Sequence, residues 1–318
     1  MRGFRLIPAA LVLAVLSACV GPQTPSVTPR ARPAGLPKPA EPEAPKGPSE
    51  ASRQLAAYYQ RVQADLLTQG LLRQDGGGID TPFTTRDIVR NFERIALYDE
   101  YARGAGLRTA ANAPSFLRRW SIPVRIGVEF GASVPEEQQA RDRSVVAGYT
   151  ARLARLTGHS ITVASPASAN FNVLVVGEDD RAQAIARIRQ LVPNISESSL
   201  DIFRTLPRSI HCLVVAFSSE GADYDYRRAV AFIRAEHPDL MRRSCFHEEM
   251  AQGLGLANDS PKARPSIFND DDEFALLTTH DEMLLRILYD ARLRPGMSPD
   301  EARPIVSEIA AGLNGGPS

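Results

Sequence analysis

The amino-acid sequence predicts an α+β fold in which helices cover a mixed sheet, with a further helical layer on the N-terminal side. Apolar segments of strand length alternate with segments of helical periodicity, an order typical of a largely covered sheet. Of 318 residues, 43% are hydrophobic and 23% are charged, which is a globular composition. The 37 basic and 37 acidic side chains balance. Because binding a phosphate backbone requires clustered positive charge, we expect no nucleic-acid partner.

The first 18 residues predict a lipoprotein signal peptide. Arg2 and Arg5 precede an apolar stretch over 6–16 that is about half as long as a membrane span requires. The stretch ends in Leu-Ser-Ala-Cys at 16–19, which resembles a bacterial lipobox. We therefore expect lipidation of Cys19 and a periplasm-facing location in the bacterial cell envelope, with the outer membrane as the expected membrane. The alternative is a plain signal peptide followed by a chance cysteine.

Residues 19–50 have the composition of a solvated tether behind the lipidated cysteine. Nine of the 24 prolines lie between Pro22 and Pro48. Such a Pro-rich segment is semi-extended and does not build a core. It would let a folded domain stand away from the membrane surface.

An N-terminal helical layer is predicted over residues 51–110. Its first helix begins near residue 51 and ends before the glycines at 76–78. The second helix, from about Thr85 to Tyr101, is predicted from Thr84 and Asp87, which have the spacing of a capping box.

The remaining residues, 111–318, are predicted to form the α+β domain. The expected strands are Ile122–Phe130, Phe171–Val176 and Cys212–Phe217. The expected helices are Val134–Thr157, Ala182–Leu191, Tyr226–Ala235, Leu240–Leu254, Asp281–Leu288 and Pro299–Ala311.

The segment 245–259 carries the residues most suited to chemistry. From position 248 it has the pattern EExxQxxGxxN. This follows the HExxHxxGxxH spacing of metzincin-type zinc peptidases, in which histidines on one helical face hold zinc and the Glu activates water. Every histidine is replaced here, and only Glu249, in the general-base position, and Gly255 remain. A strand, a long helix, further strands and then a helix with this Glu is also the order of elements in a zincin catalytic subdomain.

Helical periodicity places Glu248, Glu249 and Gln252 within an arc of about 100° that also contains Cys245, whereas His247 points away. Carboxylate and carboxamide oxygens bind zinc less well than imidazole, so we expect no metal ligands and no cofactor. Glu249 is the candidate catalytic residue, and Glu248 and Gln252 are candidate binding residues. The alternative for Glu249 is a carboxylate that is hydrogen-bonded within a helix-packing face.

Three more residues are candidates for binding: Asn258 and Asp259, which follow the motif helix, and His280. For Asn258 and Asp259 the alternative is a turn at the helix end, and for His280 a position within a helix cap, since Thr278 and Asp281 have capping-box spacing. The acidic run at 269–273 lacks the spacing of an EF-hand loop. It is therefore interpreted as a solvated loop, with a Ca²⁺ site as the alternative.

The two cysteines left after lipidation are expected to form a disulfide. Cys212 lies on a predicted strand and Cys245 begins the motif segment, in a compartment that is oxidising if the signal peptide is correct. The alternative is two buried thiols.

Several stretches together carry the signature of a known family. They are Asn91–Ala96 (NFERIA), Arg119–Trp120, Pro123–Val124, Glu248–Ser260 (EEMAQGLGLANDS), Pro265–Asp270 (PSIFND), Glu273–Thr278 (EFALLT), His280–Glu282 and Leu293–Met297 (LRPGM). Over roughly residues 80–300 the chain resembles the bacterial family catalogued as domain of unknown function 2927. The resemblance implies an envelope protein, often secreted or lipidated, in a family without an assigned reaction.

Taken together, these patterns predict a membrane-anchored envelope lipoprotein with a degenerate metallopeptidase-like domain. We expect its cleft to bind or scaffold envelope peptides or proteins without cleaving them. One alternative is an active zincin-type hydrolase that uses zinc and Glu249 as general base, with unconventional ligands such as Glu248, His280 or Asp259. A second alternative is a purely structural lipoprotein.

Overall fold

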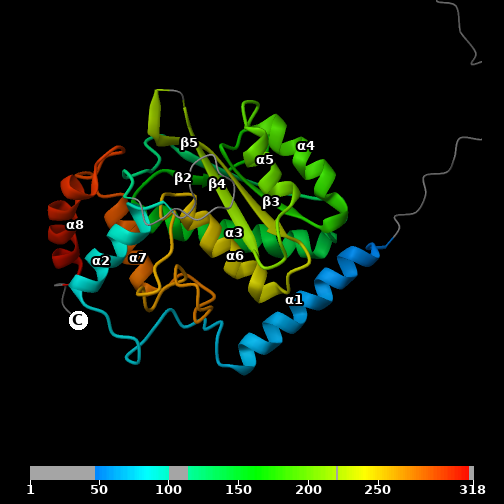
Figure 1. Ribbon diagram of the computed structural model, residues 1–318, viewed down its shortest axis with the longest axis horizontal. Coiled ribbons are helices and arrows are strands. Elements are labelled where there is room, and N and C mark those ends of the chain that lie inside the picture. The colour runs from blue at the N-terminus through cyan, green and yellow to red at the C-terminus, as the bar shows by residue number, and fades with distance from the viewer. Residues whose placement is uncertain (1–46, 100–113, 220, 315–318) are drawn as a thin grey trace, which may run out of the picture. The chain divides into compact units, whose positions relative to one another are not determined.

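The computed structural model describes residues 47–99, 114–219 and 221–314 (Figure 1). The predicted signal peptide, Cys19 and the predicted tether up to residue 46 lie outside the described residues. Among the helices that are described, none is both long and apolar enough to cross a membrane.

The described part contains eight α-helices and five strands. The helices are α1 (Glu50–Thr68), α2 (Thr85–Ala96), α3 (Glu136–Thr157), α4 (Arg181–Leu191), α5 (Glu197–Arg204), α6 (Asp239–Gln252), α7 (Thr279–Leu288) and α8 (Pro299–Asn314). The strands are β1 (Val124–Phe130), β2 (Ile161–Val163), β3 (Phe171–Val176), β4 (Cys212–Ser219) and β5 (Ala222–Arg234).

The strands form one mixed sheet in the order β2-β1-β3-β5-β4. Strands β2, β1, β3 and β5 run parallel, and β4 pairs antiparallel with β5 in a register that sets Cys212 opposite Ile233. Strand β4 therefore lies at one edge, and no described strand pairs with its outer side. The predicted class, α+β with a mixed sheet covered by helices, is confirmed.

Helices cover both faces of this sheet because its central strands are apolar on both sides. On β3, Phe171, Val173 and Val175 face a large core shared with α3, α6 and α7, whereas Leu174 and Val176 face a smaller core shared with α4 and α5. A strand buried on both faces is a continuous apolar run, which explains why β3 has the predicted bounds.

The prediction of a helix over Tyr226–Ala235 is wrong, because these residues belong to β5. Strand β5 lies between β3 and β4, and its segment Ala229–Ile233 is buried on both faces. A short apolar run fits a buried strand and a buried helix equally well when only periodicity is considered. The short strand β2 and helix α5 were not predicted at all.

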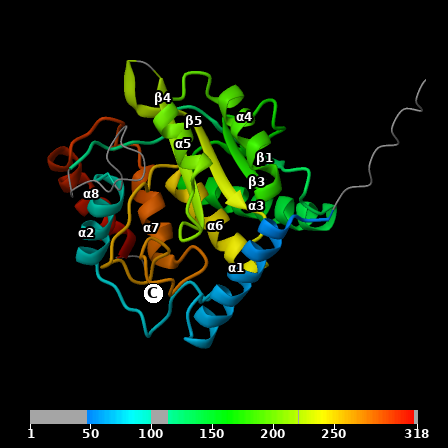
Figure 2. The same cartoon turned by 45° about the vertical axis from the view of Figure 1, so that its right-hand side comes forward.

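The two N-terminal helices pack at different places instead of forming one layer (Figures 1 and 2). On α1, Tyr59 forms a small cluster with Met241 of α6 and Ala275. Helix α2 lies beside α7 and α8. Its capping box is present as predicted: the Thr84 side chain accepts from Asp87 N, and the Asp87 side chain accepts from Thr84 N.

Candidate functional site

A buried ion pair links helix α6, which carries the motif, to helix α3. Nε of Arg242 lies 2.8 Å from the carboxylate of Asp142 on α3, and both side chains are 3% exposed. Arg242 also donates to the backbone carbonyl of His237, which precedes the helix. Burial raises the pKa of Asp142 and the Arg242 charge opposes this rise. The pair therefore joins α6 to α3 through side chains that are shielded from solvent.

His247 occupies the face of α6 that packs against α3, as its position in the helix predicts. Its ring stacks on Tyr149 with 4.0 Å between centroids, and its Nδ1 accepts a hydrogen bond from Leu277 N at 3.0 Å. Burial lowers the pKa of His247 to about 3, and positive charge from Arg152 contributes to the shift. The imidazole is therefore neutral near pH 7, and it is directed away from the acidic side chains of the motif.

The opposite face of α6 lines a cavity of about 270 Å³. The lining residues are Ser209, Ile210, His211, Cys212, Leu213, Ser244, Glu248, Glu249, Gln252, Asp259, Ile267, Asn269, Asp270, Asp272 and Phe274. Four predicted site residues are thus brought together, namely Glu248, Glu249, Gln252 and Asp259. Five of the lining side chains are carboxylic acids, and none of this lining set is lysine or arginine.

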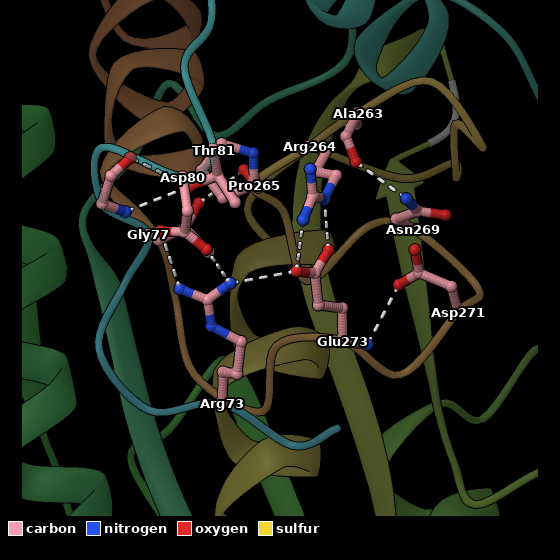
Figure 3. Close-up of polar contacts among 12 residues, drawn as sticks. Arg73, Gly77, Asp80, Thr81, Ala263, Arg264, Pro265, Asn269, Asp271 and Glu273 are labelled. Atoms are coloured by element: carbon pink, nitrogen blue, oxygen red, sulfur yellow. Dashed lines mark hydrogen bonds and ion pairs between the residues drawn. The ribbon is translucent and has the colours of Figure 1, made fainter. Parts of the chain in front are cut away.

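The loop that follows α6 contributes residues to the wall of the cavity. Ion pairs hold this loop (Figure 3). The Glu273 carboxylate lies 2.6 Å from Nε of Arg264 and 3.1 Å from Nη1 of Arg73, a residue 200 positions earlier in the chain. Arg73 also contacts Asp80 at 2.7 Å. The loop therefore has a defined path, although it contains no helix or strand of its own.

The acidic run at 269–273 is divided between this loop and the cavity. The Asp271 side chain accepts from the backbone N–H of Glu273 at 3.0 Å, and the Glu273 carboxylate contacts the two arginines (Figure 3). Asp270 and Asp272 line the cavity instead. The run therefore does not act as a single cluster of carboxylates.

The structure places Asn258 and His280 outside the cavity. Asn258 is 3% exposed, and its Nδ2 donates to the backbone carbonyl of Arg94 on α2. The His280 ring is fully buried, with Nε2 3.1 Å from Nδ2 of Asn91 and an edge contact to Phe83. Both side chains hold α2 against the rest of the domain.

A disulfide between Cys212 and Cys245 joins the start of β4 to α6, and it confirms the prediction from the sequence. The two Cα atoms are 5.8 Å apart. Cys212 lines the cavity, and its Sγ lies 4.0 Å from Oε2 of Glu248. The covalent bond therefore fixes the edge strand next to the acidic face of the helix.

The donor atoms of Cys212, Glu248 and Glu249 converge, with all three within 4.8 Å of one another. In the oxidised protein the sulfur belongs to the disulfide, and zinc binds thiolate sulfur rather than disulfide sulfur. Two carboxylates then remain, which is one ligand short of the three protein ligands of a catalytic zinc site.

Sequence reasoning did not identify the contribution of His211, Asp270 and Asp272. Burial lowers the pKa of His211, and the negative charge of Asp272 opposes that shift. One signal for His211 was available in the sequence: it directly precedes Cys212, the first residue of a predicted strand. No local pattern indicated that the loop would return to the same cavity.

The fold and the cavity define an α+β domain with an acidic pocket beside an antiparallel edge strand. The model of the family described as protein of unknown function (DUF2927) matches residues 85–308, so the chain belongs to this family. No curated protein and no solved structure matches the chain.

Proposed function

We propose that the protein is a membrane-anchored envelope protein that binds an extended, positively charged peptide segment at this cavity. The observation that carries the proposal is the arrangement of five carboxylic side chains in a cavity that opens beside the start of edge strand β4. Negative charge in a concave site favours a cationic ligand group. The ligand would be a segment of an envelope protein or peptide with a lysine or arginine side chain.

The outer side of β4, with which none of the described strands pairs, supplies the means to hold a peptide backbone. An edge strand has unpaired N–H and C=O groups, and an extended peptide can pair with them as an added strand. Side chains of such a peptide alternate between the two faces of the sheet. Because Cys212 and Leu213 belong both to β4 and to the cavity lining, a peptide on this edge would direct a side chain toward Glu248 and Glu249.

We propose further that the domain is zincin-like with a degenerate metal site. The motif helix α6 packs against β5 and the antiparallel edge strand β4, and Glu249 lines the cavity, as a general base would. The positions of the two motif histidines are occupied by Glu248 and Gln252. These side chains support binding of a cation better than activation of a zinc-bound water.

The anchoring proposal rests on the lipobox-like sequence at 16–19, and the disulfide supports it. Structural disulfides persist in oxidising compartments such as the bacterial periplasm. We therefore propose that the domain lies on the periplasmic side of a membrane, held by lipid on Cys19.

The test uses the oxidised full-length protein in detergent and two fluorescent heptapeptides that differ only in a central lysine or glutamate. We expect the lysine peptide to bind at least tenfold more tightly, because only its charge complements the cavity. Glu249→Gln and Asp259→Asn should each weaken that binding. Glu137→Gln removes a carboxylate with 88% side-chain exposure on α3 and serves as the control. Equal affinity for both peptides, or equal loss in the control variant, would contradict the proposal.

The same samples distinguish the two other functions. The proximity of the Glu248 and Glu249 oxygens favours an active metal-dependent hydrolase as the second candidate. That function requires one zinc per oxidised chain and cleavage of the peptide, both lost with chelator. A purely structural lipoprotein would bind neither peptide and hold no zinc.

A further inference from the structure

The two sulfur atoms of the disulfide have different neighbours. Cys212 faces the cavity and the carboxylates of Glu248 and Glu249. Cys245 is 2% exposed and faces His237, whose Nδ1 lies 3.6 Å from Sγ of Cys245. Breaking the S–S bond would thus release two thiols with different neighbours.

We propose that reduction of this disulfide creates a divalent-metal site on the cavity wall. Its protein ligands are the Cys212 thiolate and the carboxylates of Glu248 and Glu249, with the remaining position open to the cavity. The three donor atoms already lie within 4.8 Å of one another. Sulfur and oxygen ligands around a tetrahedral zinc ion are separated by about 3.3–3.7 Å, so small side-chain rotations suffice. Three protein ligands and one open position is the composition of zinc sites that bind an exchangeable group.

The other thiol has a local partner that keeps it out of the metal site. Burial lowers the pKa of His237 well below its usual value, and the nearby His211 contributes, so the ring is neutral. A neutral imidazole nitrogen can accept a hydrogen bond from the Cys245 thiol. The two cysteines therefore take different roles after reduction.

The reduction step needs a dithiol reductant of the periplasmic or thioredoxin-like class. One thiolate of the reductant attacks Sγ of Cys212, which lines the cavity, and Cys245 leaves as a thiolate that takes a proton. The second thiol of the reductant then displaces Cys212. Two electrons pass to the protein, the reductant becomes a disulfide, and binding of the metal displaces the proton of the Cys212 thiol to solvent. This inference does not depend on peptide binding, which is tested on the oxidised protein.

Two single variants provide a matched test, because each removes the same disulfide. Cys245→Ala leaves Cys212 as a free thiol without added reductant, and Cys212→Ala leaves only Cys245. With Co²⁺ as the probe, we expect Cys245→Ala to bind one ion per chain with thiolate-to-cobalt charge-transfer absorption. Cys212→Ala should bind at least tenfold more weakly and lack that absorption. Circular dichroism establishes that both variants are folded.

Further changes test the carboxylate ligands and the native protein. In the Cys245→Ala background, Glu248→Gln or Glu249→Gln should weaken Co²⁺ binding at least tenfold, and Glu137→Gln should leave it unchanged. The unmodified protein should gain the same absorption only after a phosphine reductant is added. Equal binding by the two cysteine variants, binding by neither, or unfolding of the reduced protein that Co²⁺ does not reverse would each overturn the proposal.

Discussion

Removal of the Cys212–Cys245 disulfide is expected to destabilise the domain by an amount that follows from the loop it closes. The two cysteines are 33 positions apart. In the chain-entropy model, a closed loop of this size lowers the entropy of the unfolded chain enough to contribute about 4 kcal/mol at 25 °C. Dividing this lost free energy of unfolding by the unfolding entropy of a domain of this length gives a fall in Tm of about 7 °C.

The assay is a pair of thermal melts followed by circular dichroism, one with and one without reductant, at pH 7 and in the presence of chelator. The double variant Cys212→Ala with Cys245→Ala provides the comparison, because its Tm should be low under both conditions. Mass spectrometry after alkylation without reductant should find neither cysteine modified. Two alkylated thiols, or a Tm that reductant leaves within about 1 °C, would refute this reasoning.

Three further predictions concern the anchor, the ion pair below α6 and the pH dependence. Cys19→Ser should move the protein from the membrane fraction to the soluble periplasm or block its processing, and unchanged membrane association on cell fractionation would contradict the lipid anchor. Arg242→Met leaves its carboxylate partner on α3 buried without a counter-charge, so denaturant titration should show a loss of about 3–5 kcal/mol. The folded-state pKa of His247 is about 3, far below its unfolded value of 6.5, so the unfolded state binds the extra proton between these values. Stability should therefore fall as pH decreases from 6.5 toward 3. His247→Asn should make the Tm less dependent on pH in this range. An unchanged slope of Tm against pH would show that His247 does not cause the fall.

Much of the fold could be predicted because its signals are local. Strand β3 has the predicted bounds, since its apolar run at 171–176 is short and lies between polar segments. Helices α2 and α7 begin at capping boxes formed by residues three positions apart, at Thr84 and Thr278. Strand β5 was misinterpreted because its identity depends on pairing with β3 and β4, and its own sequence does not reveal those neighbours.

In the candidate site, too, only the residues with local signals could be predicted from the sequence. Glu248, Glu249 and Gln252 could be grouped from helical periodicity alone, because their directions follow from their positions in one helix. Asp270 and Asp272 could not, since the path of their loop depends on ion pairs to Arg73, almost 200 residues earlier. Proximity in sequence was equally insufficient for Asn258 and His280, whose side chains contact α2.

Cysteine pairing was predictable for a different reason. With Cys19 assigned to lipidation, only Cys212 and Cys245 remain in the sequence, so a single pairing is possible. The position of this bond next to the acidic cavity was not predictable, because it depends on how β4 and α6 meet.

The most direct test of the proposed binding function is an amide chemical-shift titration of the oxidised, ¹⁵N-labelled protein with the lysine heptapeptide. We expect shifts along the outer side of β4 and in the cavity loop at 267–274, together with an intact peptide after prolonged incubation. Glu249→Gln should reduce those shifts at the same peptide concentration. Shifts centred on α4 and α5, on the other side of the sheet, or cleavage of the peptide would contradict the account.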